Sequence, residues 1–141
     1  MVNEGRIHKR DYETLAAFRY ALRRFLRFTA EGARAAGMTP QQHQLVLAVK
    51  GQRGRDWASI TELAEALQIR HHAAVGLADR CERARLVRRV ADQLDRRQVR
   101  VFLTSRGERT LACLSAQNRR ELDALRYALR LPSLTGAASG S

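Results

Sequence analysis

Two short segments of this 141-residue sequence bring together side chains that can bind polyanions. One is Arg70-His71-His72, and the other is Asp95-Arg96-Arg97. The planar guanidinium of arginine donates a fork of hydrogen bonds that matches a phosphate or the edge of a guanine. Histidine can donate to a base or accept from one. These residue types therefore point to the chemistry of nucleic-acid recognition.

The charge of the whole chain favours the same chemistry. Lys+Arg number 26 against 14 Asp+Glu, so the net charge is +12 and the pI is about 11.3, and only Lys9 and Lys50 are lysines. A pI above about 9 is typical of a domain that binds a polyanion. A GC-rich genome can explain the choice of arginine over lysine, but it does not explain the excess of bases over acids.

Length and composition predict one cytoplasmic domain over residues 1–141. A chain of this size with 45% hydrophobic residues can bury a core. We see no run of about 18–20 uncharged apolar residues for a membrane span, and the charged segment Met1 to Asp11 has no apolar stretch typical of a secretory signal. Two cysteines are too few for a disulfide framework. We therefore expect no membrane partner.

Motifs of catalysis and cofactor binding are missing from the sequence. It has no phosphate-binding glycine loop, no nucleophile elbow and no paired zinc histidines. The adjacent His71 and His72 would diverge by about 100° on a helix, and no cysteine or carboxylate is spaced to complete a tetrahedral site. We therefore expect no enzyme activity, no metal and no cofactor.

Periodicity and capping signals predict the elements that position the basic segments. Helices are predicted over 9–36, 40–50, 60–68, 71–84 and 105–131, and strands over 57–59, 86–91 and 98–104. Capping boxes mark three helix starts, at Thr39–Gln42, Ser59–Glu62 and Ser105–Glu108. Pro132 ends the last helix, and residues 132–141 are expected to form a flexible tail.

Residues 59–84 have the pattern of a helix-turn-helix. Two short helices joined by a tight turn both carry small inward-facing residues, which let the helices cross closely. The inward positions are Ile60, Leu63, Ala64, Leu67, Ala74, Leu77, Ala78 and Cys81. A hairpin with a basic tip follows, so the fold class is mainly α with a small β-wing, and the winged helix-turn-helix spans 39–104.

Several segments resemble the MarR family of bacterial transcriptional regulators, in an order of elements that also matches that family. The most specific match is the wing, where Asp92 and Asp95-Arg96-Arg97 precede the segment 101–107. The other matching segments are Ser59–Ala64, Asp79–Glu82 and Leu86–Arg89. The resemblance implies that helices 9–36 and 105–131 form a homodimer interface, and their apolar stripes exceed what a small winged helix can cover.

The sequence departs from the family pattern at three positions. Cys81 stands where the family usually has leucine, Arg85 where it has glycine, and Gln93 where proline is common. Arginine can reach the left-handed geometry of such a glycine at some cost. None of these departures removes a group that would contact DNA.

The start of the helix over 71–84 is the first predicted DNA site. In a winged helix-turn-helix this helix enters the major groove, where its N-terminal side chains meet base edges and phosphates. The residues expected to do so are Arg70, His71, His72, Val75 and Gly76. The alternative is a solvated helix end.

The hairpin tip is the second predicted site. The family pattern implies that Arg97 enters the minor groove, where a narrow A·T-rich segment concentrates negative potential. Asp95 can brace Arg97 with an ion pair, and Arg96 is expected to contact phosphate. Arg88, Arg89 and Arg100 are further candidates for backbone contacts. The alternative is an ordinary solvated charged turn.

Three other residues leave two interpretations each. Cys81 falls on the inward face of its helix and is expected to pack there. Cys113 lies beside Leu114, and redox sensing has no paired base or resolving cysteine in its support. His43 can line a ligand cavity beneath the first helix or can be a partly exposed, structurally neutral histidine.

We therefore expect a sequence-specific, double-stranded DNA-binding transcription regulator, a ligand-responsive repressor that binds a palindromic operator as a homodimer. Its partners would be DNA, a second copy of the chain and a small-molecule inducer. The alternative is a basic helical module that binds RNA or architectural DNA without a regulatory ligand. Aromatic residues are only 6%, and most lie in the first apolar stripe, which disfavours a module that stacks on single strands.

Overall fold

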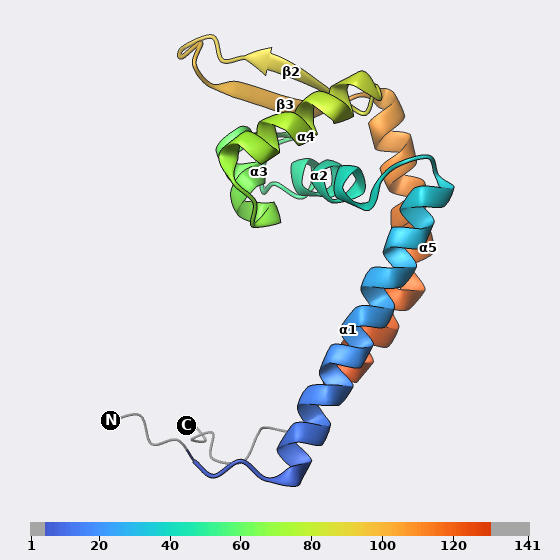
Figure 1. The fold of residues 1–141 in the computed structure, drawn as a ribbon. Coiled ribbons are helices and arrows are strands. Elements are labelled where there is room, and N and C mark those ends of the chain that lie inside the picture. Colours follow the sequence, from blue (N-terminus) through green and yellow to red (C-terminus); the bar gives the residue numbers. More distant parts are fainter. Residues whose placement is uncertain (1–4, 131–141) are drawn as a thin grey trace. The chain divides into compact units, whose positions relative to one another are not determined.

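A computed structural model describes residues 5–130 of the chain (Figure 1). They form five helices and three strands in the order α1 (Lys9–Ala35), α2 (Pro40–Lys50), β1 (Trp57–Ser59), α3 (Ile60–Leu67), α4 (His71–Arg83), β2 (Val87–Ala91), β3 (Val99–Leu103) and α5 (Ser105–Ala128). The mainly helical fold with a small β-wing is therefore confirmed. The predicted tail 132–141 lies outside the described residues.

The chain divides into two compact units, and each is described by itself. Residues 30–116 form the first unit, and the second contains residues 5–29 and 117–130 of the described chain. The division falls inside α1 and α5, so each of these long helices contributes to both units. None of the helices in residues 5–130 combines the length and apolarity needed to cross a membrane.

Helices α2 and α3 begin at the predicted capping boxes. The Thr39 hydroxyl accepts from the Gln42 amide at 3.1 Å, and the Gln42 side chain accepts from the Thr39 amide at 2.9 Å. Ser59 and Glu62 make the same reciprocal pair at 3.1 and 3.0 Å. These bonds satisfy amides that have no partner inside the helix, so they fix where each helix starts.

Two residues with positive φ form the connections on either side of α4. Gln68, at the end of α3, has φ 54°, and Arg85, between α4 and β2, has φ 63°. Glycine adopts this region without the strain that a Cβ atom causes, yet neither position has glycine. The left-handed geometry expected for Arg85 is therefore confirmed.

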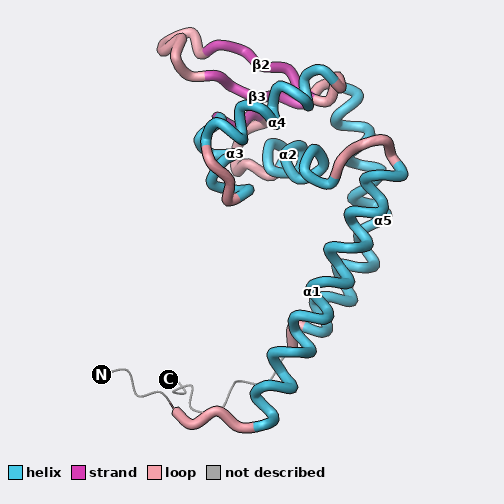
Figure 2. The backbone as a smooth tube through the Cα atoms, in the orientation of Figure 1, coloured by secondary structure: helices cyan, strands magenta, loops and turns pink. Residues whose placement is uncertain are grey.

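The wing belongs to a three-stranded antiparallel sheet in the order β1-β3-β2. Figure 2 shows its β2–β3 hairpin in magenta. Trp57 of β1 and Arg88 of β2 are both paired with Phe102 of the central strand. Because side chains alternate along a strand, these three residues share one face of the sheet. Val101 and Arg89 are paired on the opposite face, which packs toward the helices.

The start of α5 differs from the prediction. Thr104, not Ser105, caps the helix, because its hydroxyl accepts from the Gly107 amide at 3.0 Å. The same hydroxyl donates to the Arg85 carbonyl at 2.5 Å, and the Thr104 amide donates to the Leu86 carbonyl. A Cβ atom at Gly107 would lie 2.1 Å from the Leu86 oxygen, so only glycine fits there. At its other end α5 stops at Ala128, short of the predicted boundary.

One hydrophobic core supports the first unit. It joins buried side chains of α2, α3, α4, β1–β3 and the first turns of α5, including Leu45, Leu63, Leu77, Val101 and Leu114. Cys81 packs in this core as predicted, and burial raises the pKa of its thiol to about 11. His43 is buried on α2, so the prediction of partial exposure is wrong, and burial lowers its pKa.

In the second unit α1 and α5 lie side by side (Figures 1 and 2). Small residues of both helices, such as Ala17, Ala21 and Ala124, line a hollow between them. Large apolar side chains nevertheless remain exposed on both helices: Tyr12, Leu15, Tyr20 and Leu26 on α1, and Leu122, Tyr127 and Leu129 at the end of the chain described.

Candidate nucleic-acid interface

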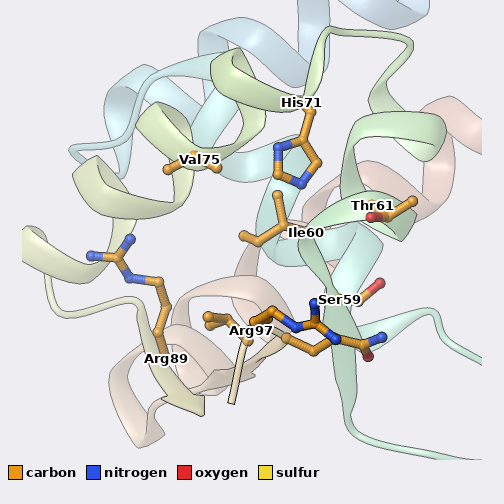
Figure 3. A pocket seen from close by; sticks show the side chains of 9 residues that line it. Ser59, Ile60, Thr61, His71, Val75, Arg89 and Arg97 are labelled. Atoms are coloured by element: carbon orange, nitrogen blue, oxygen red, sulfur yellow. The ribbon is translucent and has the colours of Figure 1, made fainter. Parts of the chain in front are cut away.

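A pocket of about 430 Å³ lies between the start of α3, the start of α4 and the wing (Figure 3). It brings together His71 and Val75 of α4 with Arg89 and Arg97 of the wing, although more than twenty residues separate Val75 from Arg97 in the chain. Thr61 and Ser59, at the start of α3, line the same pocket. Residues from both predicted DNA sites therefore face one surface.

The start of α4 is held by packing and leaves its polar groups free. Arg70 is the N-cap residue and makes no side-chain capping bond. His71 and His72 are exposed and Val75 is partly so, whereas Ala74, Leu77 and Ala78 on the other side of the helix are buried. A helix start with uncapped amides and exposed cationic or polar side chains can bind phosphate and read base edges.

Gly76 adds no side chain to the exposed side of α4. A Cβ atom there would lie 3.5 Å from an Arg80 guanidinium nitrogen, which is an ordinary contact. Gly76 therefore has no steric need to be glycine in the protein alone. It leaves the surface of α4 beside Arg80 without a side chain.

Arg89 has a role that the sequence analysis missed. Its guanidinium donates to Glu82 at 3.0 and 3.2 Å and to Asp79 at 3.1 Å, and its amide donates to Glu82 at 2.7 Å. The hydrogen bond from the Arg89 backbone amide is the chief reason that the pKa of Glu82 is lowered. Its side chain is only 27% exposed, so Arg89 holds β2 against α4 and neutralises two acids of that helix.

Asp92 organises the wing turn, which we define as residues 92–98. Its carboxylate accepts from the amides of Leu94 at 2.8 Å and Asp95 at 3.3 Å, and from Arg100 Nε at 3.0 Å. These bonds, led by the Leu94 amide, lower the pKa of Asp92. Asp95 then accepts from Arg97 Nε at 3.3 Å. The predicted ion pair between Asp95 and Arg97 is present.

Arg97 is almost fully exposed even though it makes an ion pair. Its side chain is 93% exposed although it is bound to Asp95. Arg96 is exposed beside it, and Arg88 is exposed while its guanidinium lies 4.6 Å from the centre of the Phe102 ring. These arginines can reach a ligand without leaving a buried position.

Pairing of carboxylates leaves the surface of the first unit positive. Ion pairs occupy Asp56, Glu62, Asp79, Glu82, Asp92, Asp95 and Glu108. By contrast, Arg70, Arg80, Arg88 and Arg96 make no ion pair within residues 5–130. Unpaired arginines beside neutralised acids attract a polyanion and do not repel its phosphates.

Two groups near the pocket were missed by sequence reasoning. Arg80 is exposed on α4, one turn after Gly76, and helical spacing alone could have placed it on the exposed face. Trp57 has two guanidinium groups over its ring, that of Arg55 at 4.2 Å and that of Arg100 at 4.1 Å from the ring centre. That second arrangement depends on strand register, which the sequence does not reveal.

Residues 5–130 contain no group of three or more His, Cys, Asp or Glu side chains that could hold a metal ion. His71 and His72 follow one another on α4, and only His71 lines the pocket. The site is therefore described by its arginines, histidines and small residues.

A helix-turn-helix followed by a β-hairpin, with basic side chains on both, defines this protein as a winged helix-turn-helix protein. Residues 36–98, which contain α2, the helix-turn-helix and most of the wing, match the MarR family model. These residues therefore match the MarR family, in agreement with the resemblance noted from sequence. Comparison with curated protein sequences gives no significant match.

Solved structures of MarR family regulators share the fold. AbsC, a MarR family transcriptional regulator from Streptomyces coelicolor, has a TM-score of 0.73 at 19% identity, covering 90% of this chain and 85% of AbsC. A variant of MepR from S. aureus, bound to an oligodeoxyribonucleotide, has a TM-score of 0.65 at 19% identity over 86% and 85%. BpsR from Bordetella bronchiseptica, whose DNA binding is regulated by 6-hydroxynicotinic acid, has a TM-score of 0.58 at 22% identity over 79% and 86%.

Proposed function

We propose that this protein is a homodimeric transcription regulator that binds a palindromic double-stranded DNA operator and releases it in response to a small ligand. The observation that carries this proposal is the pocket that gathers His71 and Val75 of α4 with Arg97 of the wing. In a winged helix-turn-helix these two elements enter adjacent grooves of one duplex. The DNA-bound structure of the MepR variant supports the same use of the fold.

In this proposal α4 reads the major groove. Arg70 binds guanine or phosphate, His71 and His72 bind base edges, Val75 contacts a thymine methyl group, and Gly76 allows close approach. Arg80 extends the same face and binds phosphate. Arg89 acts indirectly, because its bonds to Asp79 and Glu82 remove two negative charges from the helix that approaches DNA.

The wing turn is assigned to the minor groove. Arg97 is exposed and is held by Asp95, so it needs little reordering to insert between the strands of a narrow A·T-rich segment. Arg96 and Arg88 contact the flanking phosphates. These contacts would make affinity depend on bases outside the half-site that α4 reads.

Exposed apolar residues of α1 and α5 support the homodimer. Tyr12, Leu15, Tyr20, Leu26 and Leu122 are each 45–62% exposed in the single chain. An exposed apolar surface of this kind marks an interface. Two-fold symmetry would then place two α4 helices at half-sites about 10 bp apart, or a multiple of that spacing.

We also propose that the protein represses transcription and that a small ligand regulates its binding to DNA. The two α4 helices of the dimer can differ in spacing. A ligand that binds one spacing more tightly than another shifts the equilibrium toward it, by the difference between the two binding free energies. The regulation of BpsR by 6-hydroxynicotinic acid gives a precedent within the same fold. For this chain a small-molecule inducer is expected to weaken binding to the operator.

A titration against a palindromic duplex, a random duplex and a single strand tests the function. We expect tight binding to the palindromic duplex beside the protein's own gene, weaker binding to a random duplex, and a symmetric footprint. Binding should also weaken steeply with salt, with a slope near −0.9 per neutralised phosphate. Equal affinity for all duplexes, or preference for a single strand or RNA, would instead favour the basic-module alternative.

A further inference from the structure

The outer face of the wing sheet carries a stack of three side chains that the proposed DNA contacts do not explain. Two guanidinium groups lie over the Trp57 ring, that of Arg55 at 4.2 Å and that of Arg100 at 4.1 Å from the ring centre. Cations are attracted to the faces of an indole ring. Two like charges over one ring also repel each other, so the arrangement needs compensating anions.

Each arginine of the stack has its own carboxylate, and the two carboxylates belong to different parts of the unit. Arg100 donates to Asp92 at 3.0 Å, and Asp92 also binds the amides that shape the wing turn. On the other side Arg55 is paired with Glu62. Glu62 accepts from the Ser59 amide at 3.0 Å and so completes the capping box at the start of α3.

The contacts therefore form one continuous connection. It runs from the wing turn through Asp92, Arg100, Trp57, Arg55 and Glu62 to the first turn of α3. The wing turn has few apolar contacts of its own: its one large apolar side chain, Leu94, is 97% exposed. Without the polar connection, little in the described structure would fix the turn relative to the helices.

A second cation–π pair on the same sheet face shows what the stack adds. Arg88 lies 4.6 Å from the centre of the Phe102 ring, and Phe102 is paired with Trp57 across the strands. Arg88 has no carboxylate partner in the described chain. Phe102 and Arg88 thus cover the sheet, whereas Trp57 lies in a connection between two functional elements.

We propose that the Arg55–Trp57–Arg100 stack positions the wing turn, so that Trp57 acts on DNA recognition through Arg97 without touching DNA. This inference rests on the proposed function for its effect on binding, but its effect on the wing turn itself does not depend on DNA. Trp57 is a positioning residue, and its contribution lies in keeping Arg97 ready to enter the minor groove.

Hydrogen exchange tests the positioning without DNA. In Trp57→Leu the amides of Leu94, Asp95 and Gln98 should exchange at least about fivefold faster than in the wild type, because Asp92 loses its fixed partner. Trp57→Phe keeps an aromatic face and should restore protection. Phe102→Leu is the matched control and should leave the turn amides within about twofold of the wild type. Unchanged exchange in Trp57→Leu would overturn the inference, whether or not the protein binds DNA.

Competition binding then tests the consequence for recognition. Trp57→Leu should weaken binding to an operator with A·T-rich flanks about fivefold to tenfold while the preference among half-site bases stays the same. In the Arg97→Ala background, Trp57→Leu should weaken binding by less than about twofold, because Trp57 acts on DNA binding through Arg97. Equal weakening of every sequence in both backgrounds would show a general structural role and would contradict the inference.

Arg55→Gln provides a second variant that leaves the core untouched, should Trp57→Leu melt early. It removes one guanidinium from the stack and should speed exchange of the turn amides about twofold to threefold. Protection equal to that of the wild type in Arg55→Gln, combined with full protection in any folded Trp57→Leu fraction, would exclude the stack as the positioning device. Failure of the wild type itself to bind duplex DNA would overturn the proposed function alone.

Discussion

The start of α4 and the wing turn face the same pocket but are held in different ways. Helix α4 is fixed by buried Ala74, Leu77, Ala78 and Cys81, and the side chain of Arg70 at its start makes no capping bond. The wing turn has no such core, and its exposed arginine is held by Asp95, which is held in turn by Asp92. Packing thus leaves one region free to read bases, while hydrogen bonds preorganise the other.

Substitutions in the two regions should therefore have different effects. A residue of α4 that reads bases can be replaced without loosening its neighbours, because the core still holds the helix. A change in the wing turn alters both the contact and the order of the turn. The predictions below separate these outcomes, and they start with a change that removes the support of both regions together.

Gly107→Ala should have the largest effect. The added Cβ atom would lie 2.1 Å from the Leu86 carbonyl oxygen, where α5 meets the base of the hairpin. Relief requires backbone movement, and we expect a loss of about 3 kcal/mol in the free energy of unfolding. Thermal and urea unfolding measure it. Gly76→Ala is the control, since its Cβ atom meets only ordinary contacts, and it should not destabilise. Equal stability of the two variants would contradict the close packing at Gly107.

Arg97→Ala should have the largest effect on binding without unfolding the protein. It removes a guanidinium from both wings of a dimer, and affinity for an operator with A·T-rich flanks should fall about 100-fold. The loss should be smaller where the flanks are G·C-rich. Competition binding over sites varied only in the flanks measures this. A uniform loss on all flanks would reduce Arg97 to a phosphate contact.

Arg70→Ala and His72→Ala should change which bases are preferred. Each lost base contact at α4 is worth about 1–3 kcal/mol of discrimination. The melting temperature should stay near that of the wild type, because neither side chain is buried. The measurement is competition among operators varied in the half-site. If both variants also lost flank preference, the division between the two regions would be wrong.

Much of this arrangement was predictable because its signals are local. The capping boxes at Thr39 and Ser59, and the spacing of Ala74 and Cys81, depend on residues within a turn or two of each other. The ion pair between Asp95 and Arg97 joins residues only two positions apart. Local patterns of this kind predicted both halves of the candidate site.

The features that escaped prediction depend on strand register and on close approach between distant segments. Strand alternation alone did not show that Arg89 faces α4, because the register with Val101 decides it. The stacking of Trp57 against Arg100 depends on the same pairing. Thr104 became the cap of α5 in place of Ser105 because its hydroxyl also meets the Arg85 carbonyl, nineteen residues away.

The buried His43 predicts that the free energy of unfolding depends on pH. Burial lowers its pKa in the folded protein, whereas the unfolded chain keeps the ordinary value of about 6.5. As the pH falls below about 6.5, the unfolded state takes up the proton first, so the free energy of unfolding falls. His43→Gln should flatten this decline between pH 7 and pH 5. Chemical unfolding at several pH values measures it, and parallel curves for the two proteins would show that His43 does not contribute.

The smallest effects should come from the two positions with positive φ, one at each end of α4. Arg85→Gly removes the strain of a Cβ atom at φ 63° and should raise the free energy of unfolding by about 0.5–1 kcal/mol. Arg85→Ala is the matched control, because it removes the same charge but keeps the Cβ atom, and it should give no gain. Gln68→Gly should gain less, since it also loses the side-chain bond from Gln68 to the Glu65 carbonyl. Urea unfolding of the three variants ranks them. Stabilisation by Arg85→Ala equal to that by Arg85→Gly would show that the charge of Arg85, and not backbone strain, destabilises the connection between α4 and β2.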